Sequence, residues 1–88
     1  DSTTVYPLVI TINLNKDLLK AKQIVHDVIQ GNTKVLNKDS YTIVTTLTKD
    51  TVELKTLIKT KDLDTSFKTL SELRENIIIK LNKEKYFE

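Results

Sequence analysis

The chain has 88 residues, of which 30% are charged, and it contains no cysteine. This length predicts a single domain, and the lack of cysteine excludes disulfides, thiolate metal ligands and a cysteine nucleophile. The formal net charge is only +2 and Arg74 is the only arginine. This composition argues against a nucleic-acid or phosphate site, because such sites favour the bidentate guanidinium group.

Residues 1–6 are predicted to be a linker, and residues 7–88 are predicted to form the domain. A first strand is expected over residues 8–14, because alternate side chains there are suited to one buried face. Pro7 stands at its start, where a missing backbone donor does least harm. The residues predicted to face the core are Leu8, Ile10, Ile12 and Leu14.

The next element is predicted to be a helix that ends at Gln30. Asn15 is expected to cap it, with Asp17 in the first turn against the positive end of the helix dipole. Gly31, the only glycine, is expected to supply the left-handed residue that ends the helix. The predicted core face consists of Leu18, Ala21, Val25, Val28 and Ile29, with Ile24 at its margin.

Two further strands are predicted over residues 41–47 and 51–60, and the short turn at Lys49 and Asp50 predicts that they form a hairpin. In the earlier strand Tyr41, Ile43, Thr45 and Leu47 share one face. The aromatic ring of Tyr41 is expected to point inward. In the later strand Val52, Leu54, Thr56 and Ile58 share the face expected to cover the core.

The last helix is predicted to be capped by Asp64 or Thr65 and to run through Leu81. Its apolar residues recur every three or four positions, as on one face of an amphipathic helix. They are Phe67, Leu70, Leu73, Ile77 and Leu81. Residues 86–88, Tyr-Phe-Glu, are expected to begin a last strand.

The order strand, helix, strand, strand, helix predicts an α+β fold, a ferredoxin-like sandwich whose final strand is truncated. The first strand is expected to lie parallel, between the third strand and the missing fourth. Both helices should then cover one face of the sheet. The opposite face is expected to carry Val9, Thr11, Glu53, Lys55, Leu57 and Lys59.

Four groups of polar residues were considered as functional sites. His26 and Asp27 are neighbours on a helix and diverge, which predicts a solvated histidine rather than a catalytic one. Asp62 and Asp64 are explained by helix capping and dipole compensation, and a calcium site needs more oxygen ligands. We therefore predict no metal or catalytic site at either pair.

The other two groups are threonines of the strands and lysines of the last helix. Threonine is favoured in a half-exposed sheet, and lysine is favoured at the negative end of a helix. The threonines are Thr42, Thr45, Thr46, Thr48, Thr51, Thr56 and Thr60, and the lysines are Lys80, Lys83 and Lys85. The sequence thus predicts no catalytic, cofactor-binding or metal-binding residue.

Four blocks of sequence resemble a known family in their order and spacing. Leu8–Val25 resembles its apolar strand, acid-bearing turn and helix, and Val35–Asp39 resembles its connection into the second strand. Thr51–Lys55 resembles its third strand, and Ser71–Ile77 resembles its last helix. The chain is therefore similar to the carboxy-terminal cytoplasmic α/β domain of the small-conductance mechanosensitive (MscS-type) channels.

The resemblance implies a parent that is a homo-oligomeric membrane channel, a heptamer, opened by bilayer tension. This chain would form part of its vestibule on the cytoplasmic face of the inner membrane and would contact identical subunits. It would reach the membrane only through segments of the parent outside this chain, which starts at Asp1 without a methionine. Neither catalysis, nor a cofactor, nor nucleic-acid binding is implied.

Two other functions remain open. One is a ferredoxin-like regulatory domain that senses a small molecule, which would bind at a loop after the first strand. The other is the cytoplasmic domain of a metal-ion exporter, which would need histidine and acidic ligands beyond His26. A pore helix rich in glycine and alanine upstream in the parent would favour the channel.

The predicted topology also leaves the first strand exposed along one edge of the sheet. Edge strands carry free backbone donors and acceptors, which attract other strands. We therefore expect the chain to pair with another copy through that edge, or to exchange its terminus, at high concentration.

Overall fold

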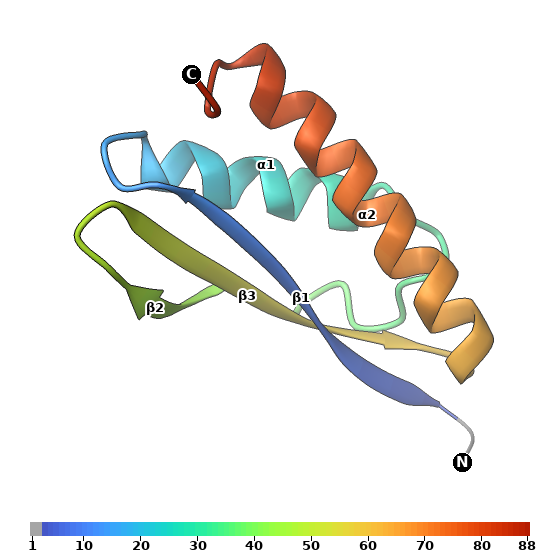
Figure 1. Cartoon of the computed structure of the whole chain (residues 1–88). Helices are drawn as coiled ribbons and strands as arrows, with labels where there is room; N and C mark the ends of the chain where they lie inside the picture. Colours follow the sequence, from blue (N-terminus) through green and yellow to red (C-terminus); the bar gives the residue numbers. More distant parts are fainter. Residues whose placement is uncertain (1–2) are drawn as a thin grey trace.

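The computed structural model describes residues 3–88. One three-stranded antiparallel sheet, in the order β1-β3-β2, is covered on one face by both helices (Figure 1). The elements are β1 (Thr4–Asn13), α1 (Leu18–Gln30), β2 (Ile43–Leu47), β3 (Thr51–Thr60) and α2 (Leu63–Lys83). The predicted α+β order is confirmed, and it is consistent with a ferredoxin-like arrangement.

β1 differs from its prediction in length and direction. It begins at Thr4, whose hydroxyl lies 3.2 Å from that of its partner Thr60, so residues 4–6 belong to the strand and not to a linker. Residues 1–2 of the predicted linker lie outside the described residues. β1 runs antiparallel to β3, and the predicted parallel orientation is wrong. The reason is that the crossover makes β1 parallel to β2, while the hairpin reverses β3 between them.

The core lies between the sheet and the two helices, where the predicted phases of β3 and α1 are confirmed. Leu54 of β3 and Leu73 of α2 are 1% and 0% exposed at the centre of this layer. Burial of these side chains supplies the main driving force for folding. The other large buried side chains are Leu8, Ile10, Ile12, Val25, Val28, Ile29, Val35, Val52, Ile58, Leu70, Ile77, Leu81 and Tyr86.

The start of α2 is rotated relative to the predicted stripe. Phe67 is 57% exposed, and its ring lies against Tyr6 with centroids 5.7 Å apart. Ser66 and Thr69 are buried instead. Neither of these two hydroxyls has a hydrogen-bond partner among the described residues. The small side chains let α2 approach the sheet closely, so the larger ring stays at the border.

β2 was expected to turn Tyr41 and Ile43 inward, and this prediction is wrong. β2 begins only at Ile43, all its residues are exposed, and Tyr41 is 80% exposed. Thr42 is buried instead, with its hydroxyl 2.7 Å from that of Thr56. The helices lie toward β1 and β3, so no helix covers the marginal strand (Figure 1).

Both helix starts use an aspartate other than the residues predicted. Asp17 caps α1, because its Oδ1 accepts from the Lys20 amide at 3.0 Å, and Asn15 lies too early. Asp62 caps α2, because its Oδ1 accepts from the Thr65 amide at 2.8 Å. A capping side chain accepts from the amide two or three residues later in the chain, and both aspartates accept from the amide three residues later.

The left-handed residue that was expected after α1 at Gly31 is found instead after α2, at Lys85. Gly31 has a φ of −81°, so it is not the predicted left-handed residue. Lys85, after α2, has a φ of 63°. The Tyr86 amide donates to the Leu81 carbonyl at 3.1 Å, and the Lys85 amide donates to the Asn82 carbonyl at 3.0 Å. This pair of bonds is the Schellman motif, which ends α2 with a lysine where glycine is usual.

The same motif overturns the predicted strand at residues 86–88. The chain reverses at Lys85 and carries Tyr86 back into the core, where it is 2% exposed. The Tyr86 hydroxyl donates to the Asp17 carbonyl oxygen at 2.6 Å and so joins the end of α2 to the start of α1. Residues 86–88 therefore form the cap of a helix rather than a strand.

Replacing Lys85 with glycine is expected to stabilise the domain by about 0.5–1 kcal/mol, because it relieves the left-handed strain of a residue with a Cβ. Gly31→Ala is the matched control at the other helix end. Its Cβ would lie 3.6 Å from the nearest oxygen, an ordinary contact, and a gain of about 0.4–1 kcal/mol is expected. Urea unfolding measures both. A loss of stability in Lys85→Gly would contradict the assigned helix end.

Candidate functional site

The polar residues named above lie in different parts of the fold, and Thr42, Thr56 and Thr60 among them are buried. His26 is exposed on α1, and its neighbour Asp27 accepts a hydrogen bond from Gln23 Nε2 at 2.8 Å instead. The two side chains therefore do not form an orienter and base. Among the described residues, no three histidine, aspartate or glutamate side chains gather where they could hold a metal ion.

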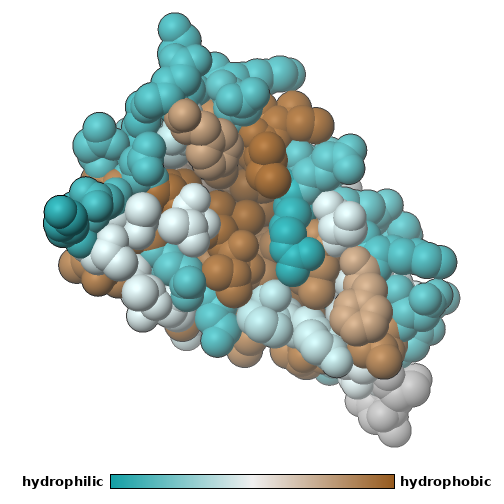
Figure 2. All heavy atoms as spheres, in the orientation of Figure 1, coloured by the Kyte–Doolittle hydropathy of each residue, from teal (hydrophilic) through white to brown (hydrophobic). Residues whose placement is uncertain are grey.

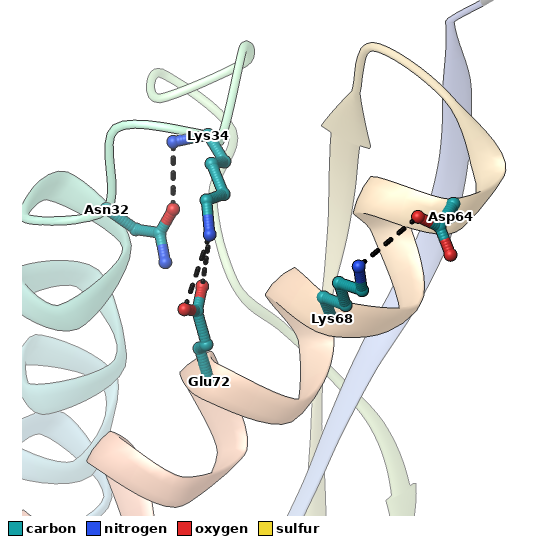
Figure 3. Close-up of polar contacts among 5 residues, drawn as sticks. All are labelled: Asn32, Lys34, Asp64, Lys68 and Glu72. Carbon is teal, nitrogen blue, oxygen red and sulfur yellow. Dashed lines mark hydrogen bonds and ion pairs between the residues drawn. The ribbon is translucent and has the colours of Figure 1, made fainter.

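Asp62 and Asp64 serve the start of α2, as predicted. Hydrogen bonds from the Thr65 side chain and amide lower the pKa of Asp62, because they favour the charged carboxylate. Asp64 lies in the first turn and pairs with Lys68, with Oδ2 and Nζ 3.4 Å apart (Figure 3). Both aspartates are thus accounted for by the helix.

The threonines of the hairpin mostly bond to one another or to nearby residues. Thr48 Oγ1 lies 2.8 Å from Thr51 Oγ1 across the turn between β2 and β3. Thr45 Oγ1 donates to Glu53 at 2.7 Å on the open face of the sheet. These contacts close the hairpin, and they confirm the interpretation of the threonines as sheet residues.

Two ion pairs join segments far apart in the sequence. Lys34 Nζ, in the connection after α1, lies 3.3 Å from the Glu72 carboxylate of α2, and the Lys34 backbone amide donates to Asn32 Oδ1 at 2.9 Å (Figure 3). Lys20 Nζ lies 2.8 Å from Glu84, which raises the pKa of the lysine through a hydrogen bond and charge attraction. Both pairs are about half exposed, so they position the helices more than they stabilise them.

The hollow beside Glu72, of about 390 Å³, is lined by polar side chains.

The open face of the sheet carries exposed apolar side chains. Val9 and Leu57 are 37% and 49% exposed, and they share this face with Ile43. A hollow of about 460 Å³ lies beside them, lined by Ser40, Tyr41, Ile43, Lys55 and Leu57. The predicted residues of this face are confirmed there, but the sequence analysis missed Tyr41 and Ile43. These two residues are exposed because β2 lies at the edge of the sheet, and that position is known only from the order of the strands.

The two edges of the sheet differ in their protection against other strands. β2 is short, and its pairing with β3 is interrupted by an irregularity between Val44 and Thr46. β1 has ten residues, pairs with β3 without interruption, and carries no charged side chain. Natural edge strands are usually blunted by shortness, charges, prolines or bulges. Of these devices β1 has only Pro7.

Seen from the side of β1 and α2, hydrophobic and weakly polar atoms gather along the middle of the molecule (Figure 2). Hydrophilic atoms lie mainly around this region. The prediction that the first strand occupies an edge is confirmed within the described residues. We name the outer side of β1 the β1 edge. Together with the open face it is the candidate functional site, because an exposed sheet edge can bind another polypeptide strand.

Within residues 3–88, neither helix combines the length and the apolar character needed to cross a membrane. Comparison of the sequence with models of known protein families gives no match, and comparison with curated proteins gives none either.

Proposed function

We propose that this chain is a non-catalytic assembly domain, the ferredoxin-like cytoplasmic domain of a homo-oligomeric channel that opens under membrane tension. The observation that carries the proposal is the β1 edge, a long, regular and uncharged strand on whose outer side no further strand pairs within residues 3–88. A domain that builds a wall with identical copies needs such binding surfaces. It needs no reaction centre.

The positions of the sequence blocks support the same proposal. The block Leu8–Val25 falls on β1 and α1, and Thr51–Lys55 falls on β3. Ser71–Ile77 lies within α2, and Val35–Asp39 lies in the connection that leads to β2. Each block thus occupies an element of the kind that the mechanosensitive channel domain has at that place in its order.

The test uses the full-length parent protein. It is expressed in cells that lack their own mechanosensitive channels, and membrane patches are recorded under suction. We expect a current that opens with tension, and survival of the cells after osmotic downshock. Cells with the empty vector are the control.

A parent without a tension-gated current, but with transport or activity that responds to a small molecule, would contradict the channel proposal. In that case the hollow of about 430 Å³ at the loop after β1 becomes the place to examine. It is lined by Asn13, Leu14, Asn15, Lys49 and Asp50.

A further inference from the structure

The register of the sheet reveals which backbone groups are free on the β1 edge. The Leu14 amide donates to the Asp50 carbonyl at 2.8 Å, in continuation of the register in which Ile12 faces Val52. Bonded and non-bonded pairs alternate along an antiparallel ladder. The even-numbered residues of β1 therefore bond to β3, and the odd-numbered residues direct their N–H and C=O groups to the free side.

The central strand confirms this parity independently. The Lys59 amide donates to Asn37 Oδ1 at 2.8 Å, and the Leu57 carbonyl accepts from Asn37 Nδ2 at 2.8 Å. These odd-numbered residues of β3 thus bond away from β1. Pro7, which has no N–H, is odd-numbered as well, so it removes no bond to β3.

We propose that the β1 edge binds the β1 edge of a second copy of this chain, antiparallel and about a two-fold axis at Val9. The residues whose backbone groups face outward extend from Val5 to Asn13, and Val9 is the midpoint of this span. The Asn13 carbonyl already accepts from the Lys16 amide at 3.1 Å, so the acceptors that remain for a partner are the carbonyls of Val5, Pro7, Val9 and Thr11. Val9 then faces Val9 of the partner, Thr11 faces Pro7, and Asn13 faces Val5. Two three-stranded sheets become one continuous sheet with all helices on the same face.

This register satisfies every free donor of the span. The Asn13 amide donates to the Val5 carbonyl of the second copy, and the amides of the two Val9 residues donate to each other's carbonyls. The Val5 amide faces the Asn13 carbonyl of the second copy, which it shares as an acceptor with the Lys16 amide. The Thr11 amide donates to the carbonyl of Pro7, and because Pro7 has no N–H the Thr11 carbonyl is the one acceptor of this pair that receives no bond. An axis at Pro7 would instead leave the centre of the contact without donors.

The side chains of β1 are also compatible with self-pairing. A two-fold axis sets equal residues near one another, and like charges there would repel. β1 has none, and its exposed Val5 and Val9 would be covered. On the helix face Leu8 meets Ile10 of the partner, which extends the two cores toward each other.

This inference does not rest on the proposed function. A closed ring of subunits with three or more members joins unlike surfaces, whereas this contact joins one edge to itself. The dimer and the wall of a channel would therefore use the β1 edge in two different ways, and one edge cannot make both contacts at once. It concerns the domain itself and is tested on the 88-residue chain alone. A tension-gated current in the parent and a dimer of this chain can therefore each be found without the other.

The test measures association by sedimentation equilibrium over a range of protein concentrations. We expect a monomer–dimer equilibrium. Val9→Glu is expected to weaken it about tenfold or more, because the two carboxylates meet at the axis. Within one chain the new carboxylate lies opposite the positively charged Lys55, so we expect the variant to keep its fold. Circular dichroism checks this. Leu57→Glu is the matched control, because Leu57 lies on the same open face but on the central strand.

Hydrogen exchange tests the register. The amides of Val5, Val9, Thr11 and Asn13 should exchange more slowly in the dimer and lose this protection in Val9→Glu. A chain that stays monomeric at all concentrations would overturn the proposal. Equal weakening by Leu57→Glu would overturn it too, since it indicates packing through the open face, as would a dimer whose β1 amides gain no protection.

Discussion

Replacing Leu54 or Leu73 with alanine is expected to lower the free energy of unfolding by about 2–5 kcal/mol, as for other large-to-small changes in a core. Leu54 lies in the central strand and Leu73 in the middle of α2, and both are almost fully buried. Each truncation removes apolar contacts and leaves a cavity that the neighbouring side chains fill only in part. A small domain has a total stability of about 5–15 kcal/mol, so each change removes a large share of it.

Urea unfolding followed by circular dichroism measures these losses. His26→Ala is the control, because this side chain is exposed on α1, and its effect should stay within about 0.5 kcal/mol. Equal and small losses at all three positions would mean that neither leucine lies at the centre of the core.

Replacing Tyr86 with alanine is expected to cost about 3–5 kcal/mol, the range for a buried aromatic side chain. This ring closes the end of the core beside Leu81. Tyr86→Phe removes only the hydroxyl that bonds to the Asp17 carbonyl, and a loss of about 1 kcal/mol is expected. Phe87→Ala is the matched control, since Phe87 is 49% exposed, and it should change stability little. If Phe87→Ala cost as much as Tyr86→Ala, the helix cap described for residues 85–86 would be wrong.

Tyr86 also predicts how stability depends on pH. Burial, and next the nearby Asp17 carboxylate, raise the pKa of this tyrosine above its ordinary value. The unfolded chain therefore releases the Tyr86 proton at a lower pH than the folded chain does. The contribution of Tyr86 is fully present below the ordinary pKa near 10 and is lost as pH rises through the folded value. In Tyr86→Phe this part of the alkaline loss should be absent.

Part of the candidate site could be predicted from the sequence. The order of elements implied that β1 lies at an edge, and the alternation in β3 placed Leu57 on the open face. The free groups of the β1 edge could not be predicted, because they depend on the register between β1 and β3. That register was itself obscured by the linker assigned to residues 1–6, since Thr4 pairs with Thr60 at the far end of β3.

By itself the sequence determined the type and order of the elements, the buried face of α1 and the central place of Leu54 and Leu73. These features depend on periodicity and on residues that are neighbours along the chain. The tertiary structure alone decided the direction of β1, the exposure of Tyr41 and the return of Tyr86 into the core. Each of these depends on what covers a residue from a distant part of the chain. A side chain with inward phase stays exposed when no helix lies above it, and a lysine adopts a left-handed conformation when the burial of the next ring offsets the strain.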